Sequence, residues 1–568
     1  MKKKKYLITT LIEETMCLKE NQVFLNPWMD KDKIETKSYP NYQELALNIK
    51  FCNDFYYKNF HHFAELLNKI HNLNLDIKFW KIFLGPWFQS FIFVVHDRWE
   101  RLLSFKKKND FDTIKAINFN LEDLSKNTYE DYVHAIKFDY LNSIIYQKII
   151  EFNDLCITEK VPFVKDSMPK KNSLSIISKF SNILIKFLGK NQKYVFINTY
   201  LPYSDEFIIN LKLKQIPLLR REFIKPEQFS YNKKIRKKKY NIFSGSSFEN
   251  FLNENIFLFL PRVFLEGFNE INKTILKENL PINPKKILCG IVPNNSHIMK
   301  YIANQKINNN KILTIQHGGD SIKNTALRIN YFENFDINLR WSKYISSKYN
   351  NVFHIGYTKK IHKNLKSNSE NIYLLLYNHS RYLIKPHIHE NLIFNNYLSK
   401  IINFINLLSF DIQKKIKIRI IGFDFWETEK KMTKIFPHIK FTKKNVNIKY
   451  LYNDASFIIS TYNATSIIES FNSNIPSCLL IDDNELNETI IAEERKHYIE
   501  LYKSKILHTN ITSASNHINE IFTKKGVNKW WQSRFTVNTL NNFKNNICYI
   551  NPNLNNDIYK FLKYEKIK

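Results

Sequence analysis

Short apolar runs alternate with helix-like segments along the second half of the chain, and this alternation constrains the fold more than any other feature of the sequence. After residue 371 the order is strand, helix, two strands, helix, strand, helix and strand, ending with the run at residues 476–482. Strands that are joined through helices pair in parallel, and the helices cover the faces of the sheet. The sequence therefore predicts a Rossmann-like α/β domain here.

The first half of the chain carries a second set of apolar runs that predict buried strands. These runs lie at residues 5–10, 22–26, 193–201, 285–295 and 311–319. We expect the first two to be the first strands of a second parallel sheet. Helical spacing at residues 42–104 predicts a helical insertion, and Ser246 with Glu249 three residues later forms a capping box at a helix start. The predicted fold class is α/β, with two Rossmann-like domains.

The chain has 568 residues, which is too long for a single hydrophobic core. A polar stretch at residues 357–371 separates the two sets of apolar runs and marks the expected domain boundary. We predict an N-terminal Rossmann-like domain at residues 1–362 and a C-terminal one at residues 363–525. Residues 526–568 are predicted to form a helical segment that packs back across both domains, with Trp530 and Trp531 as anchors.

The chain is strongly basic, and its charge raises the question of nucleic-acid binding. Lys and Arg number 85 against 53 Asp and Glu, for a formal charge of +32, but only twelve of the 85 are Arg. Arg is the residue that reads base edges and binds phosphate bidentately, and the Lys residues are scattered instead of clustered. We therefore expect no nucleic-acid partner, and at most a peripheral attraction to an anionic membrane surface.

Neither the cysteines nor the carboxylates indicate a metal site. The six cysteines are Cys17, Cys52, Cys156, Cys289, Cys478 and Cys548. They form no CxxC motif and have no His pair nearby in the sequence, so they are expected to be reduced, mostly buried thiols. Asp110 and Asp112 have DxD spacing but do not follow a buried strand. Walker, GxGxxG, GxSxG and HExxH motifs do not occur, so we predict no metal and no cofactor.

The apolar runs also bear on localisation. The N-terminal run is short, is broken by Thr9 and Thr10, and ends in Glu13 and Glu14, unlike a signal peptide. No other run approaches the roughly 20 apolar residues that cross a bilayer. The sequence predicts a cytoplasmic protein, either soluble or peripheral at the inner face of the membrane.

Polar residues gather where a buried strand meets a helix at residues 455–482. The strand delivers to its carboxyl end the residues Ser460, Thr461, Asn463, Thr465 and Ser466. In an open α/β sheet this edge faces the ligand crevice, and free helix N–H groups suit a phosphate. Glu469, one turn into the helix, could reach a ribose hydroxyl. Ser, Thr and Asn are also ordinary helix caps, so these residues are either donor-binding groups or caps.

The segment Gln316-His317-Gly318-Gly319 follows another buried strand, in a chain with only ten glycines. Glycine allows positive φ or the close approach of a ligand, and an imidazole can act as a base near neutral pH. His317 is therefore either a general base or a structural residue beside a tight turn. Glu333 is either a carboxylate near that imidazole or part of the exposed face of a short helix.

A third polar group, with Thr10 and Glu14, follows the first apolar run. Its position after a strand again indicates the cleft, although Glu is also favoured at a helix start. Asp97 and Arg98 are expected to pair with each other or with neighbouring elements.

Six segments in order resemble a family of bacterial transferases encoded in gene clusters for O-antigen and other surface polysaccharides. They are "LITTLIEET" (7–15), "WKIFLGPW" with "DRW" (80–99), "FENFL" with "LPRVFLEGF" (248–268), "IQHGG" (315–319), "STYNATSIIES" with "NIP" (460–476) and "KWWQS" (529–533). This resemblance implies a GT-B architecture and places His317 on the acceptor side. The chain departs from the family pattern at Met16, at "LNPW" (25–28) and after Gly319, which bears on the acceptor.

Together these features predict a metal-independent glycosyltransferase with a nucleotide-sugar donor and a glycan or lipid-linked acceptor. His317 or Glu14 would be the base, and Ser460, Thr461, Asn463, Thr465, Ser466 and Glu469 would bind the donor. Thr10, Gln316, Gly318, Gly319 and Glu333 would line the acceptor side. Two alternatives remain: a polyol-phosphate transferase on the same fold, and a non-catalytic or nucleic-acid-binding protein with a transferase-like fold.

Overall fold

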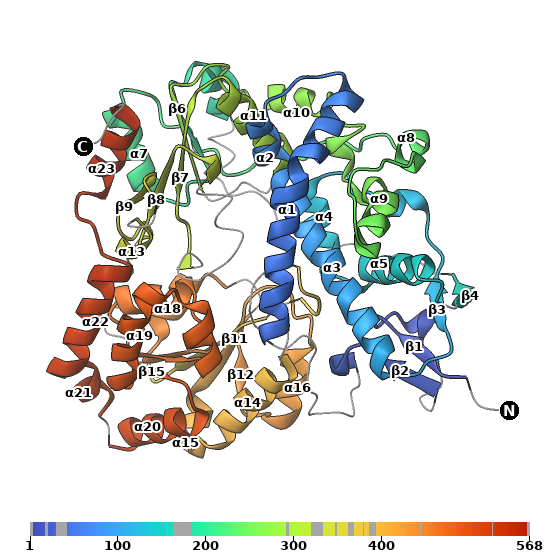
Figure 1. Cartoon of the computed structure of the whole chain (residues 1–568). Helices are drawn as coiled ribbons and strands as arrows, with labels where there is room; N and C mark the ends of the chain where they lie inside the picture. Colours follow the sequence, from blue (N-terminus) through green and yellow to red (C-terminus); the bar gives the residue numbers. More distant parts are fainter. Residues whose placement is uncertain are drawn as a thin grey trace.

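The computed structural model describes residues 4–17, 21–29, 42–155, 157–162, 183–290, 295–319, 333–346, 349–361, 369–378, 380–384, 394–443, 446–524 and 526–564. Figure 1 shows two α/β lobes, one around the strands of residues 194–354 and the other around those of residues 372–508. A helical module, formed largely by residues 42–152, lies beside them. The chain is therefore an α/β protein with two Rossmann-like domains and a helical insertion.

The N-terminal domain is built on a five-stranded parallel sheet with the order β5-β6-β7-β8-β9. Its strands are β5 (Tyr194–Ile197), β6 (Lys286–Gly290), β7 (Lys311–Ile315), β8 (Ile337–Arg340) and β9 (Val352–His354). Its helices include α7 (Tyr203–Lys212), α11 (Ser296–Ile307) and α13 (Lys343–Ser346). Strands β5 and β6 are buried along their whole length, as expected for a sheet that is covered on both faces.

The C-terminal domain contains a six-stranded parallel sheet with the order β12-β11-β10-β13-β14-β15. Its strands are β10 (Ile372–Leu376), β11 (Ile416–Ile420), β12 (Lys440–Phe441), β13 (Phe457–Ser460), β14 (Ser477–Leu480) and β15 (Leu507–His508). Its helices are α14 (Phe394–Asn406), α15 (Phe410–Lys415), α16 (Thr428–Ile435), α17 (Ile448–Asp454), α18 (Thr465–Asn472), α19 (Ala492–Lys503) and α20 (Ile511–Thr523). When the strands are numbered by their order in the sequence, they lie side by side in the order 3-2-1-4-5-6. This is the Rossmann order, with the switch point between β10 and β13.

The helical insertion packs around a core rich in aromatic residues. Its helices are α1 (Tyr42–His71), α2 (Ile77–Phe83), α3 (Gly85–Lys108), α4 (Tyr129–Ala135), α5 (Asp139–Phe152), α8 (Lys233–Lys237), α9 (Ser247–Phe259) and α10 (Ile271–Lys277). The Trp80 and Trp87 side chains are fully buried in this core. Among the described residues, no helix is both long and apolar enough to cross a membrane.

The N-terminal strands form a small sheet of their own, which corrects the expectation that they begin the Rossmann-like sheet. Strand β1 (Tyr6–Ile8) pairs with β2 (Gln22–Phe24), and β3 (Ile114–Ile117) pairs with β4 (Ile157–Val161), all in parallel. The hairpin of α1 and α3 returns the chain to β1, where the Leu7 N–H donates to the Thr113 carbonyl at 2.9 Å. Strand β1 therefore pairs with β2, contacts Thr113 and lies outside the five-stranded sheet.

The C-terminal segment crosses from one domain to the other as three helices. They are α21 (Val527–Trp531), α22 (Arg534–Ile547) and α23 (Leu554–Lys563). Helix α22 packs on the C-terminal domain through Leu540 and Phe543, and α23 packs on the N-terminal sheet through Leu562. Between them, the Tyr549 carbonyl accepts the Tyr357 N–H at 2.6 Å. The predicted domain boundary at residues 362 and 363 falls just beyond described residue 361, within a stretch that the structure does not describe.

Candidate active site between the two domains

The turn after β7 is held by the Gln316 side chain. This amide is fully buried, donates to the Gly318 carbonyl at 2.7 Å and accepts the Trp341 N–H at 2.8 Å. The Gln316 carbonyl accepts from the Thr358 hydroxyl at 3.0 Å. Gln316 therefore positions the turn after β7 by linking it to the end of β8.

Both glycines of the turn lie against the first residue of α18, in the other domain. The Gly319 N–H donates to Thr465 Oγ1 at 2.8 Å. A Cβ on Gly319 would lie 2.8 Å from both the Ala464 carbonyl carbon and the Thr465 nitrogen, and a Cβ on Gly318 would lie 2.8 Å from Thr465 Oγ1. The glycines are needed because side chains would keep the two domains apart at this point.

His317 immediately precedes the two glycines at this interdomain junction. Its ring stacks on the Tyr200 ring with centroids 4.8 Å apart, and the Lys359 ammonium lies 5.0 Å from the centroid of the same Tyr200 ring. Tyr200 follows β5 with a φ of 57°, which turns the chain at the carboxyl end of the sheet. An imidazole, a phenol and an ammonium group thus meet beside the start of α18.

Lys359 is the residue that the sequence analysis missed. Burial lowers the pKa of Lys359, and the negative charge of Glu469 across the junction counteracts this effect. Its position just after β9 and Gly356 could have indicated a site residue. In the sequence, however, Lys359 falls in the polar stretch that was assigned to the domain boundary. A partly desolvated ammonium group at this place is suited to an anionic ligand.

Glu469 lies in α18 and faces the same junction. It accepts a hydrogen bond from the Tyr452 hydroxyl at 2.9 Å. Burial raises the pKa of Glu469, while the Tyr452 hydroxyl and the charges of Lys359 and Arg419 oppose that shift. A carboxylate whose charge is disfavoured by burial is a common feature of functional sites.

The polar residues before α18 tie the strand to its neighbours instead of capping the helix. The N-cap, Ala464, makes no side-chain hydrogen bond. Thr461 Oγ1 donates to the Leu375 carbonyl at 2.9 Å, and Asn463 donates to the Tyr498 hydroxyl at 3.0 Å. Two hydrogen bonds between residues close in the sequence complete the network. Ser460 Oγ donates to the Tyr462 carbonyl, and Ser466 Oγ donates to the Tyr462 hydroxyl, each at 2.9 Å. These side chains shape the end of β13 at the switch point of the sheet.

The family comparison decides the class of protein. A family model described as LIC12162 family transferase matches residues 5–562, nearly the whole chain. The chain belongs to this transferase family. A comparison with curated proteins finds no significant match.

Solved structures that resemble this transferase do so distantly. A UDP-N-acetylglucosamine 2-epimerase matches with 10% identity and a TM-score of 0.34, covering 66% of this chain and 98% of that chain. The wall teichoic acid polymerase TagF matches with 10% identity and a TM-score of 0.34, covering 68% and 92%. The spinosyn rhamnosyltransferase SpnG matches with 7% identity and a TM-score of 0.29, covering 52% and 75%.

Three of the predicted site residues lie apart from His317 in this transferase. Glu333 precedes β8, at the amino edge of the sheet, and is exposed beside α1, where the Tyr57 hydroxyl lies 3.4 Å from its carboxylate. His317 lies at the opposite, carboxyl edge. Glu14 is exposed in the short 3-10 helix η1 (Glu13–Thr15), and Thr10 is buried after β1. The structure thus assembles the residues of "QHGG" and α18, and it places these three elsewhere.

The segment after β1 is linked through Asp139 of α5 to a second junction with the C-terminal domain. The Leu11 N–H donates to the Asp139 carboxylate at 3.1 Å, and Asp139 in turn accepts from Arg381 at 3.2 Å. Arg98, fully buried, pairs with Asp97 at 2.7 Å and donates to the Leu383 carbonyl at 2.7 Å. Asp97 and Arg98 therefore pair with each other, as expected, and they hold the helical module to the C-terminal domain.

Proposed function

We propose that the protein is a glycosyltransferase that moves a sugar from a nucleotide-activated donor to a glycan or lipid-linked acceptor in the synthesis of a bacterial surface polysaccharide, such as O-antigen or capsule. The proposal builds on membership of a transferase family. The observation that carries it is the contact of Gly319 with Thr465, because this contact brings His317 of one domain to the helix start of the other. Two substrates held by different domains can react at such a junction.

In this proposal the donor occupies the carboxyl edge of the C-terminal sheet. Nucleotides bind at the switch point of a Rossmann-like sheet, here between β10 and β13, with the phosphates at the following helix start. Lys359 lies opposite and supplies positive charge, and Glu469 accepts a hydroxyl of the ribose. Gly319 lies close to the Thr465 nitrogen, so we expect a local adjustment of the turn when the donor phosphate binds, with His317 kept at the junction.

The chemistry assigned to His317 is proton removal from the acceptor. The acceptor oxygen attacks the anomeric carbon of the donor sugar, the bond from that carbon to the phosphate oxygen breaks, and His317 takes the acceptor proton. The leaving nucleotide gains negative charge, which Lys359 and the N–H groups at the start of α18 stabilise. This scheme needs no metal ion and no cofactor.

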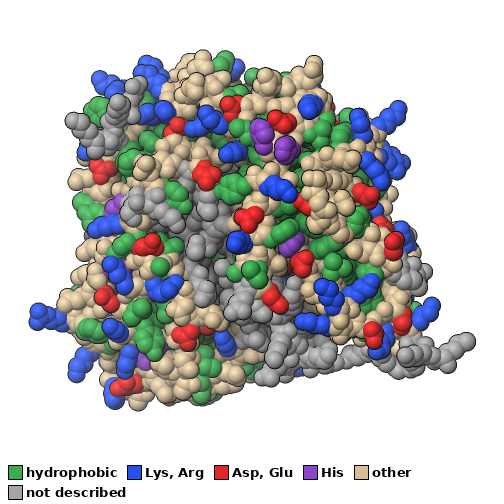
Figure 2. Space-filling model, viewed as in Figure 1, with side chains coloured by type: hydrophobic (Ala, Val, Ile, Leu, Met, Phe, Trp, Pro, Cys, Tyr) green, Lys and Arg blue, Asp and Glu red, His purple; other side chains and the backbone are tan. Residues whose placement is uncertain are grey.

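The acceptor suggests a location at the inner face of the cytoplasmic membrane, where lipid-linked glycans are built. The formal charge of +32 favours contact with anionic lipid. Figure 2 shows Lys and Arg side chains interspersed with Asp and Glu over the face in view. Such mixing disfavours nucleic acid as the partner, because its phosphates are bound by a contiguous basic face.

The experiment is a thermal-shift titration with CMP, CDP, UDP and GDP, followed by a transfer assay with the matching nucleotide sugar. One nucleotide is expected to raise the Tm, since a ligand at 100 times its Kd adds about 2.7 kcal/mol. Lys359→Met should abolish that shift, while the adjacent, exposed Lys360→Met should keep it. His317→Ala should keep the shift and lower transfer by roughly 10²–10⁴-fold.

Two outcomes would sink the proposal. If no nucleotide changes the Tm, the donor site is absent. If His317→Ala transfers at the full rate, with exposed His61→Ala on α1 as the control, His317 is not the base. Transfer of a polyol phosphate in place of a sugar, read from the mass of the product, would favour the alternative reaction.

A further inference from the structure

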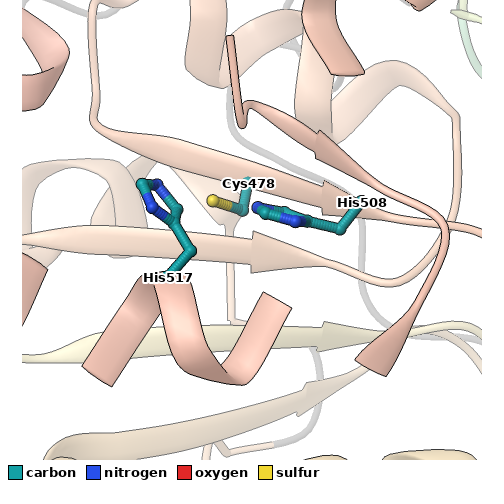
Figure 3. Close-up of side chains that lie close together, drawn as sticks. All are labelled: Cys478, His508 and His517. Atoms are coloured by element: carbon teal, nitrogen blue, oxygen red, sulfur yellow. The ribbon is translucent and has the colours of Figure 1, made fainter. Parts of the chain in front are cut away.

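Three side chains with metal-binding atoms meet inside the C-terminal domain, away from the interdomain junction. They are Cys478 of β14, His508 of β15 and His517 of α20, and their potential ligand atoms all lie within 4.8 Å of one another. Figure 3 shows the sulfur of Cys478 between the two imidazole rings. Cys478 and His508 are 30 positions apart in the sequence, and His508 and His517 are 9 apart, so the three do not form a short sequence motif.

The parallel sheet explains why they meet. Strands β14 and β15 pair with Leu480 opposite His508, and Cys478 lies two residues before Leu480. Alternate residues of a strand point to the same face, so Cys478 and His508 share one face of the sheet. Helix α20 covers that face and brings His517 to it. The cluster therefore follows from the packing of an edge strand under a helix.

All three side chains are deeply buried, and both ring nitrogens of His517 lack hydrogen-bond partners among the described residues. The exposed fractions are 1% for Cys478, 2% for His508 and 5% for His517. The His508 ring lies near the Lys505 carbonyl. A buried polar group without a partner is destabilising, so the unpaired His517 ring facing a thiol needs an explanation.

The surroundings leave the imidazoles available as ligands. Nδ1 of His508 lies 3.2 Å from the Ser513 hydroxyl, an outer partner of the kind that orients a ligating ring. The Trp530 ring packs edge-on against His517, with centroids 4.9 Å apart.

We propose that Cys478, His508 and His517 bind a structural Zn²⁺ ion. One thiolate and two imidazoles form a ligand set that zinc prefers, and the cluster is closed from solvent as structural sites are. Around a zinc ion such atoms lie about 3.3–3.8 Å apart, so the three need only close inward by small rotations. The Lys505 carbonyl oxygen, 3.7 Å from Cys478 Sγ, or a water molecule completes four ligands.

Binding replaces a proton by the ion. A cysteine binds zinc as its thiolate, so the Cys478 thiol must lose its proton. The Zn²⁺ ion takes the thiolate, and one proton leaves to solvent. Since the ion would join β14, β15 and α20, its effect is on the stability of the C-terminal domain. The proposal does not depend on the proposed transfer reaction.

The test uses the full chain without a polyhistidine tag, purified without chelator. Metal analysis is expected to find roughly one zinc ion per chain. Adding ZnCl₂ to reduced, metal-free protein should raise its Tm, since the ion binds the native state. Replacing Zn²⁺ by Co²⁺ should give the absorption of a cobalt–thiolate bond. Cys478→Ala should lose the zinc and the absorption, and the buried Cys289→Ala of β6 should keep both.

Each of these measurements either supports or contradicts the zinc site. Absence of zinc from the purified chain, together with an unchanged Tm when ZnCl₂ is added, would overturn the site. A different ion in stoichiometric amount would overturn the assignment to zinc. The cobalt measurement on the unaltered chain keeps the test valid if Cys478→Ala does not fold, because the thiolate band must then appear in the native protein.

Discussion

Glu469 is a carboxylate placed where burial disfavours its charge. Its pKa is raised by desolvation against the opposing effects of the Tyr452 hydroxyl and the charges of Lys359 and Arg419. In the unfolded chain the same carboxyl group titrates near its ordinary value. Between the two pKa values the native state binds more protons than the unfolded state, so stability falls as pH rises through that window. Above the native pKa the full cost of the charge remains.

Replacement of Glu469 by Gln should therefore raise stability and lower activity. Gln keeps a side-chain oxygen for the Tyr452 hydroxyl but carries no charge. At pH 7 we expect the Tm to rise by about 2–4 °C, the shift that 1 kcal/mol produces in a domain of this size. The gain should vanish in acid, below the unfolded pKa of the carboxyl group. Transfer should fall at least tenfold, about 1.4 kcal/mol, if Glu469 binds the donor.

Exposed Glu493→Gln on α19 is the matched control for Glu469→Gln, and its Tm should change little at any pH. A Tm for Glu469→Gln that is lower than that of the unaltered protein at pH 7 would show that the charge is stabilising. Trade-offs between stability and activity are common where a site holds a desolvated charge.

At the scale of elements, helix α23 packs on the N-terminal domain, although about 200 residues separate it from β9, the last strand of that domain. Its residues Ile558, Phe561 and Leu562 pack with Phe196, Leu313 and Leu339 of the five-stranded sheet. The buried Lys286 side chain of β6 also donates to the Phe561 carbonyl at 2.8 Å. Without α23 the outer face of this sheet would expose apolar side chains to water.

The change Leu562→Ala tests this dependence. Leu562 is fully buried, and deletion of such a side chain costs about 2–5 kcal/mol. We expect the Tm to fall by roughly 5–15 °C. Tyr564→Ala, at the end of the same helix and 53% exposed, is the control and should leave the Tm nearly unchanged. Equal Tm values for the two variants would mean that α23 does not contribute to the N-terminal domain.

Local elements could be predicted from the sequence because their causes are local. The apolar runs at β5, β6, β7, β10, β13 and β14 are strands, and the capping box of Ser246 and Glu249 begins α9 as expected. The expected strands β1 and β2 do pair, but the contact of β1 with Thr113 was not predictable, since it depends on the hairpin that returns Thr113 to Leu7. Lys359 and the Cys478 cluster were missed for the same reason. Their partners are distant in sequence and meet only through the sheets.

At the scale of the whole molecule, two of the junctions between the domains differ in kind. One joins Gly319 to Thr465. The other joins the helical module to the C-terminal domain through Arg98 and the Leu383 carbonyl, and through Trp28, whose ring packs edge-on against Tyr382 at 5.6 Å and Trp426 at 5.4 Å. The second junction combines aromatic rings with the buried Asp97–Arg98 ion pair. Beside the first junction, the Ser342 hydroxyl donates to Glu494, and Trp341 packs in one cluster with Ile467 of α18.

The change Gly319→Ala should separate the domains at the turn after β7. Its Cβ would lie 2.8 Å from two backbone atoms at the start of α18, which cannot move aside as a flexible side chain can. The φ of Gly319 is not in the left-handed region, so the effect comes from contact alone. We expect transfer to fall at least tenfold, about 1.4 kcal/mol, and small-angle scattering to show a larger radius of gyration. Gly526→Ala, whose Cβ would meet nothing closer than 3.7 Å, should behave as the unaltered protein. Full activity and unchanged dimensions in Gly319→Ala would show that reaction does not require this contact, and the acceptor and donor sites would then have to be sought at a more open junction.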